Sequence, residues 1–163
     1  MLTLISKPSL AIIHSAIQAE LDAFYLYKHL ANQTQRLGLF GASSYFHKES
    51  ADEMAHYQLH ADFLNDRGTV AELPTIEEIT EGVGGLMDAL KTALLAEMDL
   101  GVNYSNWYAE TAIKDPMTGQ HLLQFIEIQR KSIGEYGDWI QRLTISGNNG
   151  MVALLIDKEL GEK

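Results

Sequence analysis

Four long segments with helical periodicity most restrict what this chain can fold into. In each of them, apolar residues recur every three or four positions, which is the spacing of one face of an α-helix. The expected long helices cover residues 9–37, 42–66, 82–113 and 116–144. At 1.5 Å per residue each would be about 40 Å long, so the four can lie side by side as one bundle.

The breaks between the segments define how the helices connect. Pro8, Pro74 and Pro116 are the only prolines in the 163 residues, and each falls at a boundary. The stretch 67–80 is long enough to cross the length of a bundle. After Ser146-Gly-Asn-Asn-Gly150, residues 151–161 predict a short fifth helix. The sequence therefore predicts one all-α domain over 1–163: a four-helix bundle with one long crossover and a short C-terminal helix.

Composition excludes several kinds of function. The chain has no cysteine, so any metal must be held by oxygen and imidazole ligands rather than by thiolates. Its formal net charge of −10, without a basic patch, argues against a nucleic-acid partner. No apolar run reaches the length of about 18 residues that a membrane span needs, and the N-terminus does not resemble a signal peptide. We therefore expect no membrane partner and a cytoplasmic location.

Polar side chains interrupt the apolar stripe of every long helix near its middle. They are Glu20 in the first helix, Glu53 and His56 in the second, Glu97 in the third and Gln129 in the fourth. A buried lone carboxylate would cost several kcal/mol or take up a proton, unless it is paired or bound to a metal. Oxygen ligands with one imidazole suit iron, with manganese, zinc or cobalt as competitors. The pattern predicts a metal centre inside the bundle.

Other readings of these residues stay open. A single acid on a helix is usually solvated, and one Glu-x-x-His pair is a weak signal by itself. A non-enzymatic helical interaction protein could also carry mid-core acids as paired residues, although these three acids have only one histidine among them. Glu127 is a second candidate ligand on the fourth helix. Asp52 could belong to a third iron site or a mineral-nucleating patch, or it could be a solvated acid.

Several segments together resemble the ferritin family, specifically non-haem ferritins like the animal H type, and more distantly the bacterioferritins. They are ELDAFYLY at 20–27, FHKESADEMAH at 46–56, ALLAE at 93–97, KSIGEYGD at 131–138 and LLIDKELG at 154–161. The resemblance covers nearly the whole chain.

The resemblance implies a di-iron ferroxidase centre. In that family pattern, Glu20 and His56 would each anchor one iron, Glu53 would bridge them, Glu97 would complete the second iron's shell, and Gln129 would match the amide of H-type ferritins. The implied activity is the oxidation of Fe(II) to Fe(III) by dioxygen or peroxide, with storage of the product as a ferric mineral. The implied assembly is a homo-oligomeric cage of 24 subunits.

Tyr27 would lie beside this centre, where it could hydrogen-bond a ligand and lend an electron during oxidation. It is equally compatible with an ordinary core tyrosine. The other family variants remain as alternatives. Met54 occupies the place of the haem-ligating methionine of bacterioferritins, but a bacterioferritin register on the fourth helix would put Ile133 and Tyr136 at ligand positions, and the fifth helix argues against haem. A DNA-protecting mini-ferritin would place its ligands between subunits and needs no fifth helix.

Overall fold

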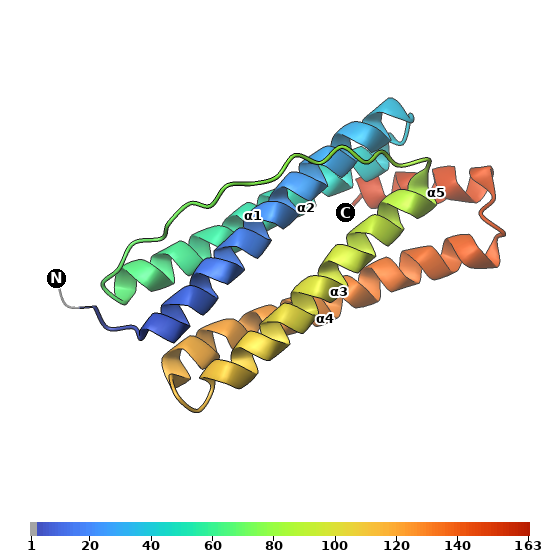
Figure 1. The fold of residues 1–163 in the computed structure, drawn as a ribbon. Helices are drawn as coiled ribbons and strands as arrows, with labels where there is room; N and C mark the ends of the chain where they lie inside the picture. Colours follow the sequence, from blue (N-terminus) through green and yellow to red (C-terminus); the bar gives the residue numbers. More distant parts are fainter. Residues whose placement is uncertain (1–2) are drawn as a thin grey trace.

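A computed structural model describes residues 3–163, and its regular structure over that range is entirely α-helical (Figure 1). The helices are α1 (Lys7–Arg36), α2 (Phe40–Asp66), α3 (Leu86–Thr111), α4 (Pro116–Ile145) and α5 (Gly150–Gly161). This confirms the predicted all-α bundle with a short C-terminal helix.

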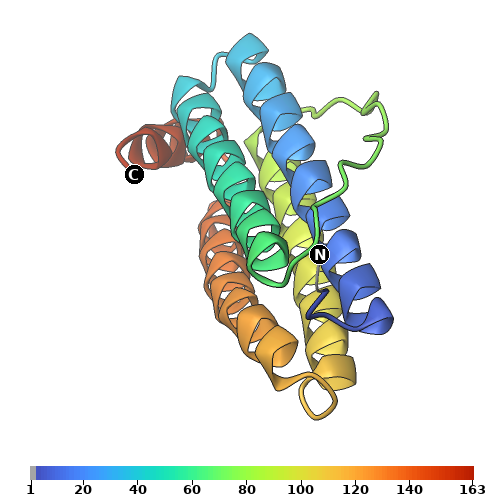
Figure 2. The same cartoon turned by 90° about the vertical axis from the view of Figure 1, so that its left-hand side faces the viewer.

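The four long helices form two antiparallel hairpins, α1 with α2 and α3 with α4, which pack against each other (Figures 1 and 2). The crossover between the hairpins, residues 67–85, runs the length of the bundle beside α1. Side chains of α1 hold it there: Gln18 Nε2 donates to the carbonyl of Thr75 at 3.2 Å, and His29 Nε2 lies 2.6 Å from the carbonyl of Glu81. The long connection is thus attached to α1 by side-chain contacts at two points.

Local capping explains where two helices begin. α1 begins at Lys7, two residues before the expected start, because the Ser6 hydroxyl accepts a hydrogen bond from the Ser9 backbone N–H and Pro8 fits the first turn. In the same way, the Asp115 carboxylate accepts from the Thr118 N–H at the start of α4.

The expected start of the third helix at residue 82 is wrong, because α3 begins at Leu86. Gly82, Gly84 and Gly85 lie just before it, and Gly85 has an extended backbone. Glycine loses more conformational entropy in a helix than other residues, so the helix starts only after the last of them. The Gly84 N–H donates to the Asp88 carboxylate at 3.1 Å, which holds this start in place.

The fifth helix is fixed by an unusual cap on α2. The Asp157 carboxylate of α5 accepts hydrogen bonds from the backbone N–H groups of Gly41 (3.2 Å) and Ala42 (2.7 Å) in the first turn of α2. α2 has no capping side chain of its own at Leu39. A Cβ at Gly41 would lie 1.7 Å from the Asp157 carbonyl oxygen, so only glycine allows this approach.

The core lies between the two hairpins and is rich in aromatic side chains. Its largest fully buried members include Tyr27, Phe46, Tyr104, Phe125 and Tyr136. Within the described residues, no helix is long and apolar enough to cross a membrane.

Candidate metal centre

The four helices each bring one predicted polar residue to the middle of the bundle. Glu20 of α1, Glu53 of α2, Glu97 of α3 and Gln129 of α4 have exposed fractions of 0%, 4%, 1% and 1%. The His56 side chain, one turn after Glu53, is 14% exposed. Burial of three carboxylates is what the interrupted stripes predict, and it rules out the alternative that these acids are solvated.

Glu20, Glu53 and His56 converge on one point. His56 Nδ1 lies 3.0 Å from Glu53 Oε2 and 3.3 Å from Glu20 Oε2, and one ligand atom from each residue falls within 4.8 Å of the others. Such a cluster can hold a single cation with two oxygens and one nitrogen. One cation at this cluster could be bound by Glu20 and His56 together, whereas the family pattern led us to expect that each anchors a separate iron.

A second set of groups lies beside this cluster. The Tyr27 hydroxyl donates a hydrogen bond to Glu97 Oε1. Both amide atoms of Gln129 are buried and, among the described residues, have no hydrogen-bond partner. Buried polar atoms without partners are costly unless they bind a ligand. Glu97 and Gln129 are thus buried polar residues outside the Glu20, Glu53 and His56 cluster, and the Gln129 amide has room to accept or donate to a ligand.

Burial and mutual contact set the charges of the first cluster. Burial raises the pKa of Glu53 well above its ordinary value, and the neighbouring Glu20 raises it further. Burial also opposes ionisation of Glu20, but hydrogen bonds from Glu53 and His56, together with the charge of His56, outweigh it and lower the pKa of Glu20. Burial opposes protonation of His56, yet Glu20 and Glu53 raise its pKa to about 10. Without a metal, the cluster therefore holds protons that a cation must displace.

Glu97 and Tyr27 also stay partly or wholly protonated. Burial raises the pKa of Glu97 to about 7, against the opposing effect of the Tyr27 hydrogen bond. Burial and the charge of Glu97 raise the pKa of Tyr27 well above its ordinary value, so its hydroxyl remains a donor.

The structure adds three residues that the sequence analysis did not assign to the centre. The Tyr104 hydroxyl donates to Glu20 Oε1 and lies 2.8 Å from His60 Nε2, and His60 Nδ1 lies 2.8 Å from His121 Nε2. Burial lowers the pKa of His60 to about 3 and that of His121 to about 4, so both imidazoles are neutral. Tyr104 and His60 do lie in the apolar stripes, and a polar group in a stripe is the signal that could have identified them.

Glu49 is a further acid near the centre that the sequence analysis missed. It is half-buried, accepts a hydrogen bond from the Tyr136 hydroxyl at 3.1 Å, and its pKa is raised to about 7 by burial and by nearby Glu97, Asp52 and Glu135. Nothing in the sequence marks it, because it lies beside the stripe rather than in it.

Three candidates from the sequence lie away from the cluster. Glu127 is exposed and forms a two-point ion pair with Arg130, with both N–O distances 2.8 Å. Asp52 is exposed beside the buried Glu53. Met54 is 36% exposed on the outside of α2. Of the two fourth-helix candidates, Gln129 is buried and Glu127 is exposed.

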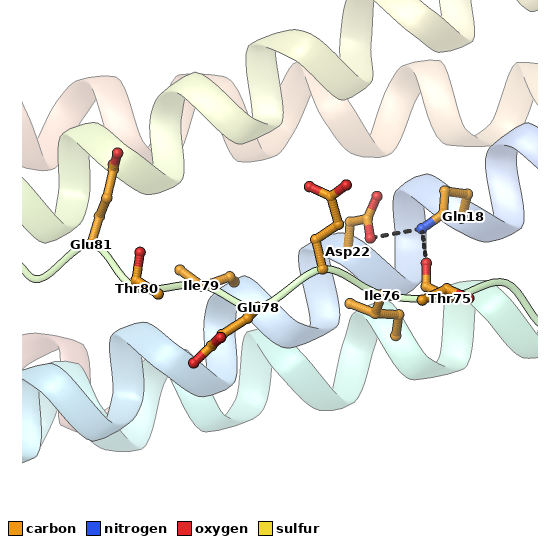
Figure 3. A pocket seen from close by; sticks show the side chains of 9 residues that line it. Gln18, Asp22, Thr75, Ile76, Glu78, Ile79, Thr80 and Glu81 are labelled. Carbon is orange, nitrogen blue, oxygen red and sulfur yellow. Dashed lines mark hydrogen bonds between the residues drawn. The ribbon is translucent and has the colours of Figure 1, made fainter.

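An acidic groove between α1 and the crossover is separate from this centre (Figure 3). It is lined by Gln18, Asp22 and residues 75–81, and Gln18 bridges Asp22 and the Thr75 carbonyl with bonds of 2.8 and 3.2 Å. None of the predicted ligands lines it.

The fold and the centre together define a class: four-helix-bundle proteins with a carboxylate and histidine metal centre inside the bundle. Residues 10–145 match the ferritin-like domain, and the chain belongs to the ferritin family. Family membership and the glutamate and histidine cluster together support an iron-storage ferritin.

The relatives of this chain can be aligned with it over nearly its full length. The chain is 32% identical to a ferritin from the crayfish Pacifastacus leniusculus over 156 residues, which cover 93% of this chain and 86% of that one. It is 25% identical to a bacterial non-heme ferritin from Staphylococcus epidermidis over 162 residues, or 98% and 97% of the two chains. An open pore ferritin from Archaeoglobus fulgidus has the same fold, with a TM-score of 0.92 at 24% identity over 98% of this chain and 99% of that one.

Proposed function

We propose that this protein is a ferroxidase that binds two Fe(II) ions between its helices, oxidises them with dioxygen or peroxide, and stores the ferric product as a mineral. The observation that carries the proposal is the convergence of two buried carboxylates and one imidazole, with a third buried carboxylate, Glu97, and the buried, unpartnered amide of Gln129 on the two remaining helices of the described chain. Structural carboxylates of this kind would be paired with basic groups, but among the described residues they meet only His56 and the neutral His60, whose Nε2 lies 4.0 Å from Glu20 Oε1.

The residues divide into two unequal sites. Glu20, Glu53 and His56 hold the first Fe(II), and Glu53, Glu97 and Gln129 hold the second. Anionic oxygen ligands bind Fe(III) more strongly than Fe(II), so the ligand set favours the loss of an electron from each ion. Two Fe(II) then reduce one dioxygen, and two protons complete the balance to two Fe(III) and hydrogen peroxide.

Tyr27 is positioned to act on the second site. Its hydroxyl donates to Glu97, which orients that carboxylate for the cation. Its ring stacks with Phe46 and Tyr136, at centroid distances of 6.0 and 6.5 Å. We propose that it holds Glu97 in place and supplies an electron when only one iron is bound.

Oxidation kinetics test the ferroxidase proposal. Fe(II) is added under air, and the absorbance of the ferric product is followed in the near ultraviolet. We expect iron to be oxidised far faster with the wild type than in buffer alone. Glu53→Ala should lower the rate at least about 100-fold, because it removes the shared ligand. Asp52→Ala is the matched control: it removes the adjacent, exposed carboxylate and should leave the rate nearly unchanged. Equal rates for wild type, Glu53→Ala and buffer would refute the proposal.

Storage requires an enclosed space, so we further propose that copies of this chain assemble into a cage of 24 subunits. Gel filtration of the metal-free protein should then give one large species, and iron loaded under air should elute with it. Elution as a monomer or dimer, with iron in a separate precipitate, would refute the cage.

A further inference from the structure

A chain of hydrogen bonds leads from the metal centre to the surface. Starting at Glu20 Oε1, it passes through the Tyr104 hydroxyl, then His60 Nε2 and Nδ1, then His121 Nε2, with both histidine links 2.8 Å long. Glu20, His60 and Tyr104 are completely buried, whereas His121 is half-buried and its Nδ1 lies 3.4 Å from the amide of exposed Gln124. The chain therefore links a sealed carboxylate to solvent.

The donors determine the direction in which each hydrogen bond of this series points. Tyr104 has one hydroxyl hydrogen and gives it to the Glu20 carboxylate, so the link to His60 requires a hydrogen on His60 Nε2. Because the buried His60 is neutral, its Nδ1 must accept, and His121 must carry its hydrogen on Nε2. His121 Nδ1 is then free to accept from the Gln124 amide or from water. Every donor points toward Glu20, and each imidazole has one defined tautomer.

Aromatic packing holds the participants in line. The His60 ring stacks on Phe125 at 4.3 Å between centroids, and the His121 ring stacks on Phe63 at 4.1 Å. Tyr104 also stacks on Phe125, at 4.9 Å. Rings fixed in this way keep the donor and acceptor atoms within hydrogen-bond distance of each other, which a proton relay requires.

We infer that Tyr104, His60 and His121 form a proton relay between Glu20 and solvent. In one transfer, His121 passes its Nε2 proton to His60 Nδ1, His60 passes its Nε2 proton to the tyrosine oxygen, and Tyr104 passes its own to Glu20. His121 takes a new proton from water at Nδ1, so each ring ends neutral in its other tautomer. Because all donors are now reversed, the next transfer carries a proton from Glu20 outward.

The relay matters to the proposed function, on which this inference rests. Binding of a cation displaces protons from the buried cluster, and reduction of dioxygen to hydrogen peroxide consumes two. Exchange with solvent interconverts the two sets of tautomers, so the relay carries protons inward from one set and outward from the other without the bundle opening. Tyr104, His60 and His121 are thus positioning and proton-transfer residues rather than ligands.

Hydrogen exchange at His60 tests the relay without any metal. The whole protein is labelled with nitrogen-15 histidine, and solid-state NMR of the sediment resolves its six histidines. We expect the Nε2–H tautomer at His60 and His121, and fast exchange of the His60 Nε2 hydrogen with solvent despite complete burial. His121→Gln, which cannot shuttle protons, should slow that exchange by about tenfold or more. His47→Gln is the control, because His47 is exposed and takes no part in the proposed relay.

The direction of the change separates a relay from a packing role. If His121 only supported the fold, its loss would loosen the bundle and speed up exchange at His60; that result, or no change, would overturn the relay. His121→Leu, which keeps an apolar contact to Phe63, is the second variant if the glutamine variant does not fold.

A second experiment uses Zn(II), which has no redox chemistry, to test whether the relay carries protons that leave the metal centre. A pH indicator in a stopped-flow instrument follows the protons released when Zn(II) binds. We expect His121→Gln to release as many protons as the wild type, about tenfold more slowly. Equal rates would overturn the relay and leave the ferroxidase proposal standing. Wild type that binds no Zn(II) and oxidises no Fe(II) would refute the proposed function instead, even with fast exchange at His60.

Discussion

At the scale of single residues, protons and metal ions compete for the same side chains. His56 has a pKa raised to about 10 and Glu97 a pKa raised to about 7, so both hold protons in the metal-free protein at pH 6. A cation in the first proposed site needs deprotonated His56, and a cation in the second needs deprotonated Glu97. Binding is therefore an exchange of protons for metal, and its strength depends on pH.

Metal affinity should accordingly rise with pH. Below pH 7, filling both proposed sites displaces protons from His56 and Glu97, and the raised pKa of Glu53 adds to this; between pH 7 and 10 the His56 proton remains to be displaced. Each displaced proton gives about a tenfold gain in affinity per pH unit. Calorimetric titration with Fe(II) in the absence of oxygen, at pH 6, 7 and 8, measures this slope. An affinity that does not change across this range would contradict the assigned ligands.

The amide at Gln129 predicts that the two sites are unequal. The first site has two carboxylates and an imidazole, whereas the second has Glu97, the shared Glu53 and a neutral amide with no partner in the described chain. Gln129→Glu adds an anionic ligand and should tighten the second Fe(II) step by about tenfold or more, with the first step little changed. Iron titrations of both proteins resolve the two steps. Glu127→Gln, on the exposed face of the same helix, should change neither.

The sequence predicted these ligands because each is a polar residue within an apolar stripe, and a stripe identifies the buried face of a helix. It could not predict the pairing of Tyr104 with Glu20 or of His60 with His121. Those contacts depend on how far each helix is rotated and shifted against its neighbour. Periodicity defines a buried face within one helix, but it carries no information about the register between two.

At the scale of elements, the contact between α5 and α2 also could not be predicted from sequence periodicity. The length and composition of residues 151–161 predict a helix, but its docking depends on the Asp157 carboxylate reaching two N–H groups of α2. Ala42 and Asp157, which one of these bonds joins, are 115 positions apart in the sequence. The expected third-helix start failed for a local reason instead, since three glycines oppose helix formation there.

Gly41→Ala should weaken the docking of α5. The added Cβ meets the Asp157 backbone 1.7 Å away, so α2 and α5 must separate and the cap must lengthen. We expect a loss of about 2 kcal/mol in the free energy of unfolding, measured with denaturant. Gly134→Ala is the matched control: it lies within α4, and a Cβ there meets nothing within 4 Å. It should be neutral or slightly stabilising, because alanine favours helix. Equal effects would contradict the tight contact.

At the scale of the whole molecule, the buried acids make the metal-free bundle sensitive to pH. The pKa of Glu49 is raised to about 7 by burial and neighbouring acids. A raised folded-state pKa gives a contribution to stability that is complete below the ordinary value near 4.5 and is lost as pH rises through 7. Glu97 and His56 have raised values as well, so their contributions have the same sign and together exceed the opposite contributions of His60 and His121, whose pKa values burial lowers. The metal-free protein should be more stable at pH 5 than at pH 8.

Glu49→Gln isolates one part of this dependence, because an amide of similar size cannot ionise. Glu49 contributes a difference on the order of 3 kcal/mol between pH 5 and pH 9, and the variant should lose that part of the slope. Denaturant unfolding of the metal-free protein at both pH values measures it, with exposed Glu110→Gln as the control. Since bound cations take the place of the protons, saturating Zn(II) should also reduce the slope in the wild type. A wild-type protein that gains stability from pH 5 to pH 8 without metal would show that these carboxylates are already ionised and balanced by other groups.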